Sequence, residues 1–151
     1  MLKEKNKKEE KIIKYIGIDW GEKRIGLAAA DSEMWMAMPL AIVYSFDELL
    51  EFLAKEEPDQ LVVGMPYTMA GHKGEAAGKV SEFIKMLEAS TRYPVAKVDE
   101  RLSSSAIDSM YDKRKAPEER DAIAAMLILE TYINQLEKGE KKEDKVFPNL
   151  S

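Results

Sequence analysis

Apolar and polar positions alternate with a period of two along residues 12–19, IIKYIGID, and this period predicts a β-strand. Isoleucines dominate one face of the strand, and the other face ends at Asp19. The turn WGEKR and a second apolar run, IGLAAAD, follow at once and complete a predicted hairpin. A third strand is expected within MWMAMPLAIV, closed by Pro39.

Helices and strands alternate after this point. Residues 46–57, FDELLEFLAKEE, carry apolar side chains at helical spacing, and Pro58 follows them. QLVVGM is the continuous apolar run typical of a buried strand, residues 75–89 predict a helix, and PVAKV predicts another strand. A short helix is expected at SSSAIDSMYDK, and a long one begins at Pro117, which suits the first helical position.

This order of elements predicts one α/β domain with a mixed sheet, antiparallel in its first strands and parallel in its later ones, flanked by helices. The chain has 151 residues, which is the usual size of a single domain. We place the domain at residues 12–138, with a charged flexible tail at 1–11 and a loose polar tail at 139–151.

Composition excludes several kinds of chemistry. The chain has no cysteine, which rules out disulfides, thiolate catalysis and cysteine zinc sites. The single histidine, His72, lies in a glycine-flanked loop, and we assign it no catalytic role. No apolar run approaches the about 18 residues of a membrane span, and the charged N-terminus lacks a signal peptide's apolar stretch. We therefore expect a cytoplasmic protein without a membrane partner.

The formal net charge of −5 is unfavourable for binding nucleic acid, because phosphate neutralisation supplies much of that affinity. It does not exclude such binding. A small basic patch can suffice locally, and carboxylates reserved for divalent cations count as acidic in the sequence although the cations neutralise them in the site.

Three acidic residues lie where chemistry is expected. Asp19 ends the first strand, Glu100 follows the PVAKV strand, and Asp121 lies in the first turns of the long helix. Strand ends from distant parts of a sequence meet at one edge of an α/β sheet, and a helix above that edge can add a third carboxylate. Converging carboxylates suit Mg²⁺, which could activate water for phosphodiester cleavage. Turn formation and ion pairing remain alternative roles for all three.

Four segments in register then resemble one family. "GIDWGEKRIGLAAAD", "VVGMPYTMAG", "PVAKVDERLSS" and "RDAIAAMLILETY" are similar to the successive motifs of the YqgF/RuvX family, and the resemblance covers nearly all of the chain apart from its tails. These small ribonuclease H-like proteins are named as pre-16S rRNA nucleases or as Holliday junction resolvases. The resemblance implies a ribonuclease H-like sheet, dependence on Mg²⁺ or Mn²⁺, and hydrolysis of a phosphodiester to a 5′-phosphate and a 3′-hydroxyl.

The resemblance also assigns residues. It places the family's catalytic and metal-binding acids on Asp19, Glu100 and Asp121. It further matches three basic residues to the family's motifs, and we interpret these as phosphate contacts or support for the site: Lys23, Arg24 and Arg101. The stretch DKRKAPEER adds a local basic patch beside the long helix, formed by Lys113, Arg114 and Lys115.

Two regions depart from the family pattern or stay open. The loop "MPYTMAG" has Thr68 and Ala70 where the family often has an asparagine and an acid, so polar substrate contacts from it are in doubt. Methionines and tryptophans gather around the hairpin, and we interpret them mainly as sheet packing or a subunit contact: Trp20, Met34, Trp35, Met36 and Met38. Trp20, next to Asp19, could alternatively stack a base.

The favoured function is a metal-dependent nuclease that matures the 5′ end of precursor 16S rRNA. A resolvase of four-way DNA junctions is the alternative within the same chemistry, and the chain could be a monomer or a homodimer. The glycine hairpin also resembles the phosphate-binding hairpin of actin-like ATPases and sugar kinases, but the chain has only one such hairpin. A protein that binds RNA or the ribosome without catalysis is a more distant reading.

Overall fold

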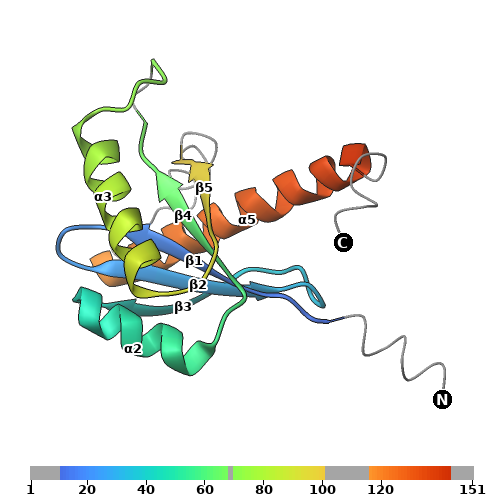
Figure 1. The fold of residues 1–151 in the computed structure, drawn as a ribbon, viewed down its shortest axis with the longest axis horizontal. Coiled ribbons are helices and arrows are strands. Elements are labelled where there is room, and N and C mark those ends of the chain that lie inside the picture. The colour runs from blue at the N-terminus through green and yellow to red at the C-terminus, as the bar shows by residue number, and fades with distance from the viewer. Residues whose placement is uncertain (1–10, 68–69, 101–115, 144–151) are drawn as a thin grey trace.

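The computed structural model of the protein describes residues 11–67, 70–100 and 116–143. A five-stranded sheet with the order β3-β2-β1-β4-β5 forms its centre (Figure 1). The strands are β1 (Lys14–Trp20), β2 (Ile25–Asp31), β3 (Met38–Val43), β4 (Gln60–Met65) and β5 (Val95–Asp99). The predicted short helix at residues 103–113 lies outside the described residues.

The sheet is mixed, as the sequence predicts. β1 pairs antiparallel with β2, and β2 pairs antiparallel with β3. On its other side β1 pairs parallel with β4, and β4 pairs parallel with β5. Because β1, β4 and β5 run in the same direction, their carboxyl ends lie at one edge of the sheet, where ligand sites of open α/β sheets form.

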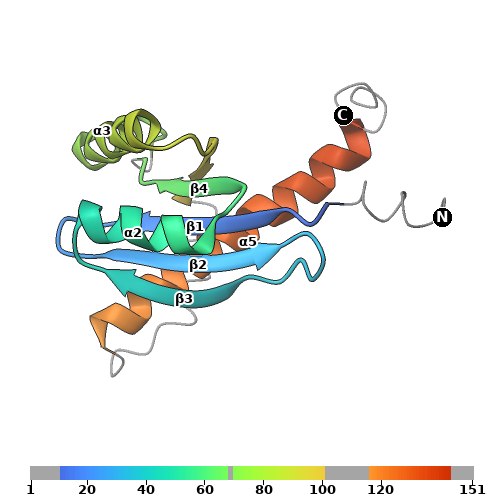
Figure 2. The same cartoon turned by 60° about the horizontal axis from the view of Figure 1, so that its bottom comes forward.

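Three helices within the described residues cover the two faces of the sheet. They are α2 (Phe46–Glu56), α3 (Glu75–Ser90) and α5 (Pro117–Glu143). Figures 1 and 2 show α2 and α3 on one face and α5 crossing the opposite face, with the last turns of α5 extending beyond the sheet. Strand alternation divides β1 accordingly, so Ile16 and Ile18 pack in the core beneath α2 and α3, while Tyr15 packs in the core beneath α5.

Local sequence explains where α2 begins and ends. The hydroxyl of Ser45 accepts a hydrogen bond from the backbone N–H of Glu48 at 3.1 Å, which satisfies one of the unpaired donors at the helix start. Glu57 ends the helix in the left-handed conformation, and Pro58 prevents its continuation. The predicted helix is thus confirmed, and its buried face carries Leu49 and Leu53.

Glycines let α5 lie directly on the sheet. A Cβ at Gly26 would lie 2.1 Å from the carbonyl oxygen of Asp121, and one at Gly17 would lie 2.9 Å from the carbonyl oxygen of Ala125. Ala125 itself is fully buried, and its small side chain permits this close approach. The space beside Gly17 is therefore filled by the α5 backbone and is not available to a ligand.

Three local expectations are corrected. Pro39 lies inside β3 instead of closing it, which an edge strand tolerates because one side of its backbone has no strand partner. α5 continues to Glu143, beyond the boundary expected near Lys138. Sheet packing of three methionines around the hairpin is also wrong, because all three side chains are exposed, and their interpretation as a subunit contact stays a prediction: Met34, Met36 and Met38.

Candidate active site

Asp19 lies one residue before the end of β1, on the face that α5 covers. The strand is fixed there by its pairing with β2, in which Asp19 is opposite Gly26. Burial raises the pKa of the Asp19 carboxyl well above its ordinary value, and the negative charges of Glu100 and then Asp121 raise it further. A buried aspartate whose pKa is raised by neighbouring negative charges is typical of a functional site that binds a cation.

Glu100 directly follows β5 and is partly buried beside β4. A Cβ at Gly64 would lie 2.7 Å from the Oε2 atom of Glu100, so the glycine provides the space that this carboxylate occupies. Burial raises the pKa of Glu100, and the neighbouring charge of Asp99 adds to the shift. Two carboxylates with raised pKa values therefore lie at the carboxyl edge formed by β1 and β5.

Asp121 reaches the same region from α5. Its backbone packs over Gly26, and its Oδ2 atom accepts a hydrogen bond from Nε of Arg24 at 2.7 Å. Both side chains are partly exposed, with fractional exposures of 25% for Arg24 and 30% for Asp121. Arg24 therefore neutralises part of the negative charge that Asp121 brings close to Asp19.

A cavity of about 450 Å³ opens beside the two strand-end carboxylates. Asp19 and Glu100 line it from the sheet, and Glu75, Ala76 and Lys79 line it from the first turns of α3. Lys79 is the one lysine or arginine among the described residues that line this cavity. The cavity thus places a cationic side chain opposite a pair of carboxylates, which is a suitable arrangement for a phosphate group and a metal ion together.

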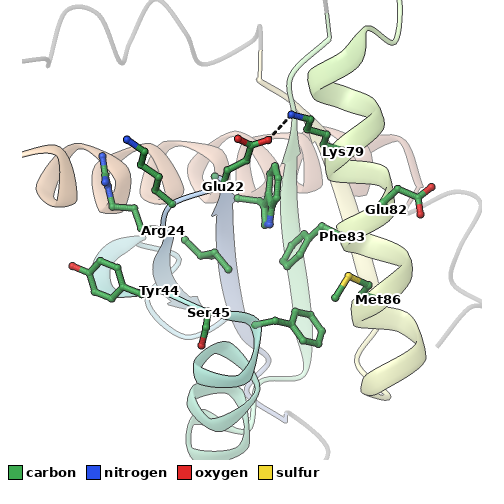
Figure 3. Close-up of a pocket in the computed structure, with 13 residues that line it drawn as sticks. Glu22, Arg24, Tyr44, Ser45, Lys79, Glu82, Phe83 and Met86 are labelled. Carbon is green, nitrogen blue, oxygen red and sulfur yellow. Dashed lines mark hydrogen bonds and ion pairs between the residues drawn. The ribbon is translucent and has the colours of Figure 1, made fainter.

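The amino group of Lys79 is paired with Glu22, which lies in the turn between β1 and β2. Hydrogen bonding and charge attraction from Lys79 lower the pKa of Glu22, and the same contact raises the pKa of Lys79. Figure 3 shows the pair bridging the gap between the turn and α3. Both side chains are solvent-exposed, so the contact can exchange with water or with a bound anion.

The donor set fits a hard divalent cation, because all three acids supply oxygen atoms. Within residues 11–67, 70–100 and 116–143, however, no three histidine or carboxylate side chains form a ready-made metal cluster. Asp121 is instead held by Arg24. The pair formed by Asp19 and Glu100 is the part of the set that shares one cavity, and Asp121 acts on Asp19 through its charge.

The predicted basic residues divide into two groups. Lys23 and Arg24 lie in the turn after β1, where Lys23 is exposed and Arg24 contacts Asp121. The remaining predicted contacts lie outside the described residues: Arg101, Lys113, Arg114 and Lys115. The sequence reasoning missed Lys79 and Glu22, because nothing in the local pattern separates them from other charged residues of a solvated helix or turn.

The fold is that of ribonuclease H-like nucleases. RuvC of T. thermophilus, solved in complex with a Holliday junction substrate, superposes with a TM-score of 0.52 over 82% of this chain and 96% of RuvC, at 14% sequence identity. The fowlpox virus resolvase, solved with Holliday junction DNA, also gives a TM-score of 0.52, over 82% of this chain and 99% of the resolvase, at 16% identity. Identities this low establish the shared fold alone.

Sequence comparison gives the family. The model of the family described as "RuvX: Holliday junction resolvase" matches residues 13–135. A protein of Chloroflexus aggregans is 33% identical over 130 residues, which cover 79% of this chain and 92% of the relative. One of Maridesulfovibrio salexigens is 34% identical over 133 residues, which cover 80% and 98%. Both relatives carry the name "Putative pre-16S rRNA nuclease".

The fold thus places an acidic cavity at the carboxyl edge of its central sheet. The chain belongs to the RuvX family. The predicted ribonuclease H-like fold and the resemblance to this family are therefore confirmed. No helix in the described ranges is long and apolar enough to cross a membrane.

Proposed function

We propose that the protein is a divalent-metal-dependent nuclease of precursor 16S rRNA, with Asp19, Glu100 and Asp121 as its catalytic carboxylates. The observation that carries this proposal is the cavity that Asp19 and Glu100 line together at the edge of the sheet, where burial and neighbouring negative charges raise the pKa of both carboxyl groups. A buried carboxylate under such repulsion is stabilised when a cation binds beside it. The names of the curated relatives support precursor rRNA as the substrate.

Asp19 and Glu100 would hold the cation, because they line the same cavity, and Asp121 would complete the set from α5. Mg²⁺ or Mn²⁺ suits these oxygen ligands, and such an ion would supply an activated water and stabilise the leaving oxygen. The protein's own contribution is rigidity. Pairing with Gly26 of β2 fixes Asp19, β4 holds β1 as far as Ile18, and Gly64 leaves a defined space for Glu100.

Lys79 and Arg24 would bind and position the substrate. Lys79 lines the catalytic cavity from α3, and its partner Glu22 is exposed, so a substrate phosphate can replace Glu22 at the amino group. Arg24 holds Asp121 in place and offsets its charge in the metal-free protein. Lys23 lies exposed in the same turn as Arg24 and adds a third positive charge near the site, on a chain whose net charge is −5.

Cleavage of four-way DNA junctions is the second candidate, because the matching family model carries the description of a Holliday junction resolvase. The two substrates can be compared directly with purified protein. One is a labelled RNA that spans the 5′ end of 16S rRNA with its leader, and the other is a labelled four-way DNA junction. Each reaction contains Mg²⁺, Mn²⁺ or EDTA, and Asp19→Asn serves as the control for contaminating nucleases.

Metal-dependent cleavage of the RNA that Asp19→Asn abolishes is the expected result. Symmetric nicking of the junction, without cleavage of the RNA, would show that the substrate is branched DNA and not precursor rRNA. Equal behaviour of wild type and Asp19→Asn on both substrates would overturn the catalytic assignment and favour a protein that binds RNA without cutting it.

A further inference from the structure

A second cleft adjoins the catalytic cavity on the face of the sheet that carries α2 and α3. Its volume is about 380 Å³, which lies within the range of small-ligand sites. The β1–β2 turn, the junction of β3 with α2, and α3 form its walls. Figure 3 shows Phe83 and Met86 projecting from α3 on one side, with Arg24 and Tyr44 on the other.

Aromatic rings form the floor of this cleft. Trp20 and Phe46 both contact the buried Phe83, with ring centroids 5.9 Å and 6.2 Å from its own. Trp20 and Phe46 are only partly buried, so part of each ring remains available to a ligand. The exposed side chains of Tyr44 and Met86 extend this surface outward. Flat apolar walls of this kind suit a planar ring.

The cleft shares three lining residues with the catalytic cavity. Trp20, Glu22 and Lys79 line both of them. Trp20 follows Asp19 directly on β1, and strand alternation turns the two side chains to opposite faces. Because the cleft and the cavity share these three residues, a ligand that crosses the end of β1 can place a phosphate beside Asp19 and an attached group on the aromatic floor.

The charged side chains of the cleft lie apart from its aromatic floor. Lys23, Arg24 and Lys79 line it toward the turn. Two carboxylates also line the cleft, and each is paired with a lysine: Glu22 with Lys79 and Glu82 with Lys85. The floor itself is apolar and uncharged. A nucleotide has the complementary arrangement, with an anionic phosphate at one end and a neutral aromatic base at the other.

We propose that this cleft binds an unpaired nucleobase of the substrate strand, next to the phosphate held at Asp19. The inference rests on the proposed nuclease function and adds the feature of the substrate that the enzyme selects. A base can enter the cleft only when it is unstacked and unpaired, so the enzyme cuts beside single-stranded or flipped-out nucleotides. Aromatic contact selects for the presence of a base and little for its identity, because every base has a π-face.

Binding can be measured without cleavage, in EDTA. The variant Trp35→Phe leaves Trp20 as the only tryptophan, so its fluorescence reports directly on the cleft. The probes are an oligoadenylate RNA of about ten nucleotides, the DNA of the same sequence, and an abasic sugar–phosphate strand of the same length. We expect both base-bearing strands to quench Trp20 and the abasic strand to leave its emission unchanged. RNA and DNA together show whether the sugar contributes to recognition.

Two methionine variants provide a matched comparison in the same Trp35→Phe protein. Met86→Glu places a charge in the cleft, and Met38→Glu places the same charge on β3, outside the cleft lining. The two methionines are 48% and 60% exposed, so both variants are expected to fold, which a melting curve checks. Met86→Glu should lower the affinity for base-bearing relative to abasic strands by about tenfold, the effect of losing one stacked base. Met38→Glu should leave this ratio unchanged.

Quenching by the abasic strand equal to that by the base-bearing strands would overturn the inference, as would an unchanged affinity ratio in Met86→Glu. These results are independent of the proposed chemistry. Cleavage that requires Asp19, together with equal binding of base-bearing and abasic strands, would contradict the base site and leave the nuclease function supported. Preferential binding of base-bearing strands by a protein that cuts neither substrate would contradict the nuclease function and support the base site.

Discussion

Nε of Arg24 lies 2.7 Å from Oδ2 of Asp121, and this hydrogen bond joins a turn after the first strand to the last helix, 97 residues later in the sequence. The contact belongs to the candidate active site, because Asp121 also raises the pKa of Asp19. Arg24 thus carries a positive charge in the metal-free protein where the proposed mechanism needs a cation.

Removing this charge should make the protein more dependent on metal. Arg24→Ala leaves the repulsion between Asp121 and Asp19 without compensation, and we expect the melting temperature in EDTA to fall by about 2–4 °C, which corresponds to about 1 kcal/mol at this chain length. Addition of Mn²⁺ should then raise the melting temperature by more in the variant than in wild type. Lys85→Ala, which removes only an exposed ion pair within α3, is the control. An equal response to Mn²⁺ in wild type and Arg24→Ala would show that Arg24 does not offset the carboxylates.

The contact of Gly26 with α5 predicts a second sensitive position. Gly26→Ala would place a Cβ 2.1 Å from the carbonyl oxygen of Asp121, so the first turns of α5 must move and carry Asp121 with them. We expect loss of cleavage activity and a lower melting temperature. Gly78→Ala is the matched control, because a Cβ there meets nothing within 4 Å and the change removes a glycine from the interior of a helix. It should stabilise the protein by about 0.5–1 kcal/mol and leave activity intact. Full activity in Gly26→Ala would mean that the position of Asp121 is not critical.

Asp19→Asn should stabilise the metal-free protein, and by more at pH 8 than at pH 5. The folded protein raises the pKa of Asp19, so folding favours the protonated form. The contribution of Asp19 to stability is therefore most favourable at low pH. This contribution is lost as the pH rises from the pKa in the unfolded chain, about 4, through the raised pKa in the folded protein. Asparagine carries no charge at any pH and avoids this loss. Each unit by which the pKa is raised corresponds to about 1.4 kcal/mol, or about 2–4 °C in the melting temperature.

Thermal melting in EDTA at the two pH values measures this difference. Asp47→Asn, at an exposed aspartate in the first turn of α2, controls for the general effect of removing one negative charge. A gain in Asp19→Asn that is the same at both pH values would contradict the assigned burial and repulsion.

The exposed pair of Glu22 and Lys79 gives a prediction on substrate binding. In Glu22→Gln the Lys79 amino group loses its anionic partner and is more available to a phosphate, so single-stranded RNA should bind more tightly at low salt. Lys79→Gln should bind the same RNA more weakly. Filter binding in EDTA at two salt concentrations measures both, and the difference between the variants should shrink as salt rises. Weaker binding in Glu22→Gln would show that Glu22 positions Lys79 for the substrate instead of competing with it.

Sequence periodicity predicts the elements well where one face of an element is buried. The alternation in β1, the continuous apolar run of β4 and the helical spacing in α2 are all confirmed, because burial on one side imposes these patterns. The order of the elements also gives the mixed sheet, and the sheet brings Asp19 and Glu100 to one cavity.

Contacts between elements could not be predicted in the same way. The bond between Arg24 and Asp121 and the close approach of α5 to Gly26 depend on how two distant segments pack, which no local pattern records. The strand boundary predicted at Pro39 was wrong, because β3 is an edge strand and accepts a proline that a central strand excludes. The aromatic cleft brings Trp20 together with side chains from α2 and α3, so it emerges only when the sheet and its helices are assembled.

The central claim is that Asp19, Glu100 and Asp121 hold a divalent cation that the cleavage reaction requires. The measurement that tests it most directly is Mn²⁺ binding by calorimetry, made beside single-turnover cleavage, for Asp19→Asn, Glu100→Gln and Asp121→Asn, with Asp47→Asn as the control. We predict that each of the three variants weakens Mn²⁺ binding and abolishes cleavage while the control matches wild type. Wild-type Mn²⁺ affinity and cleavage rate in any one of the three would contradict the assignment of that carboxylate.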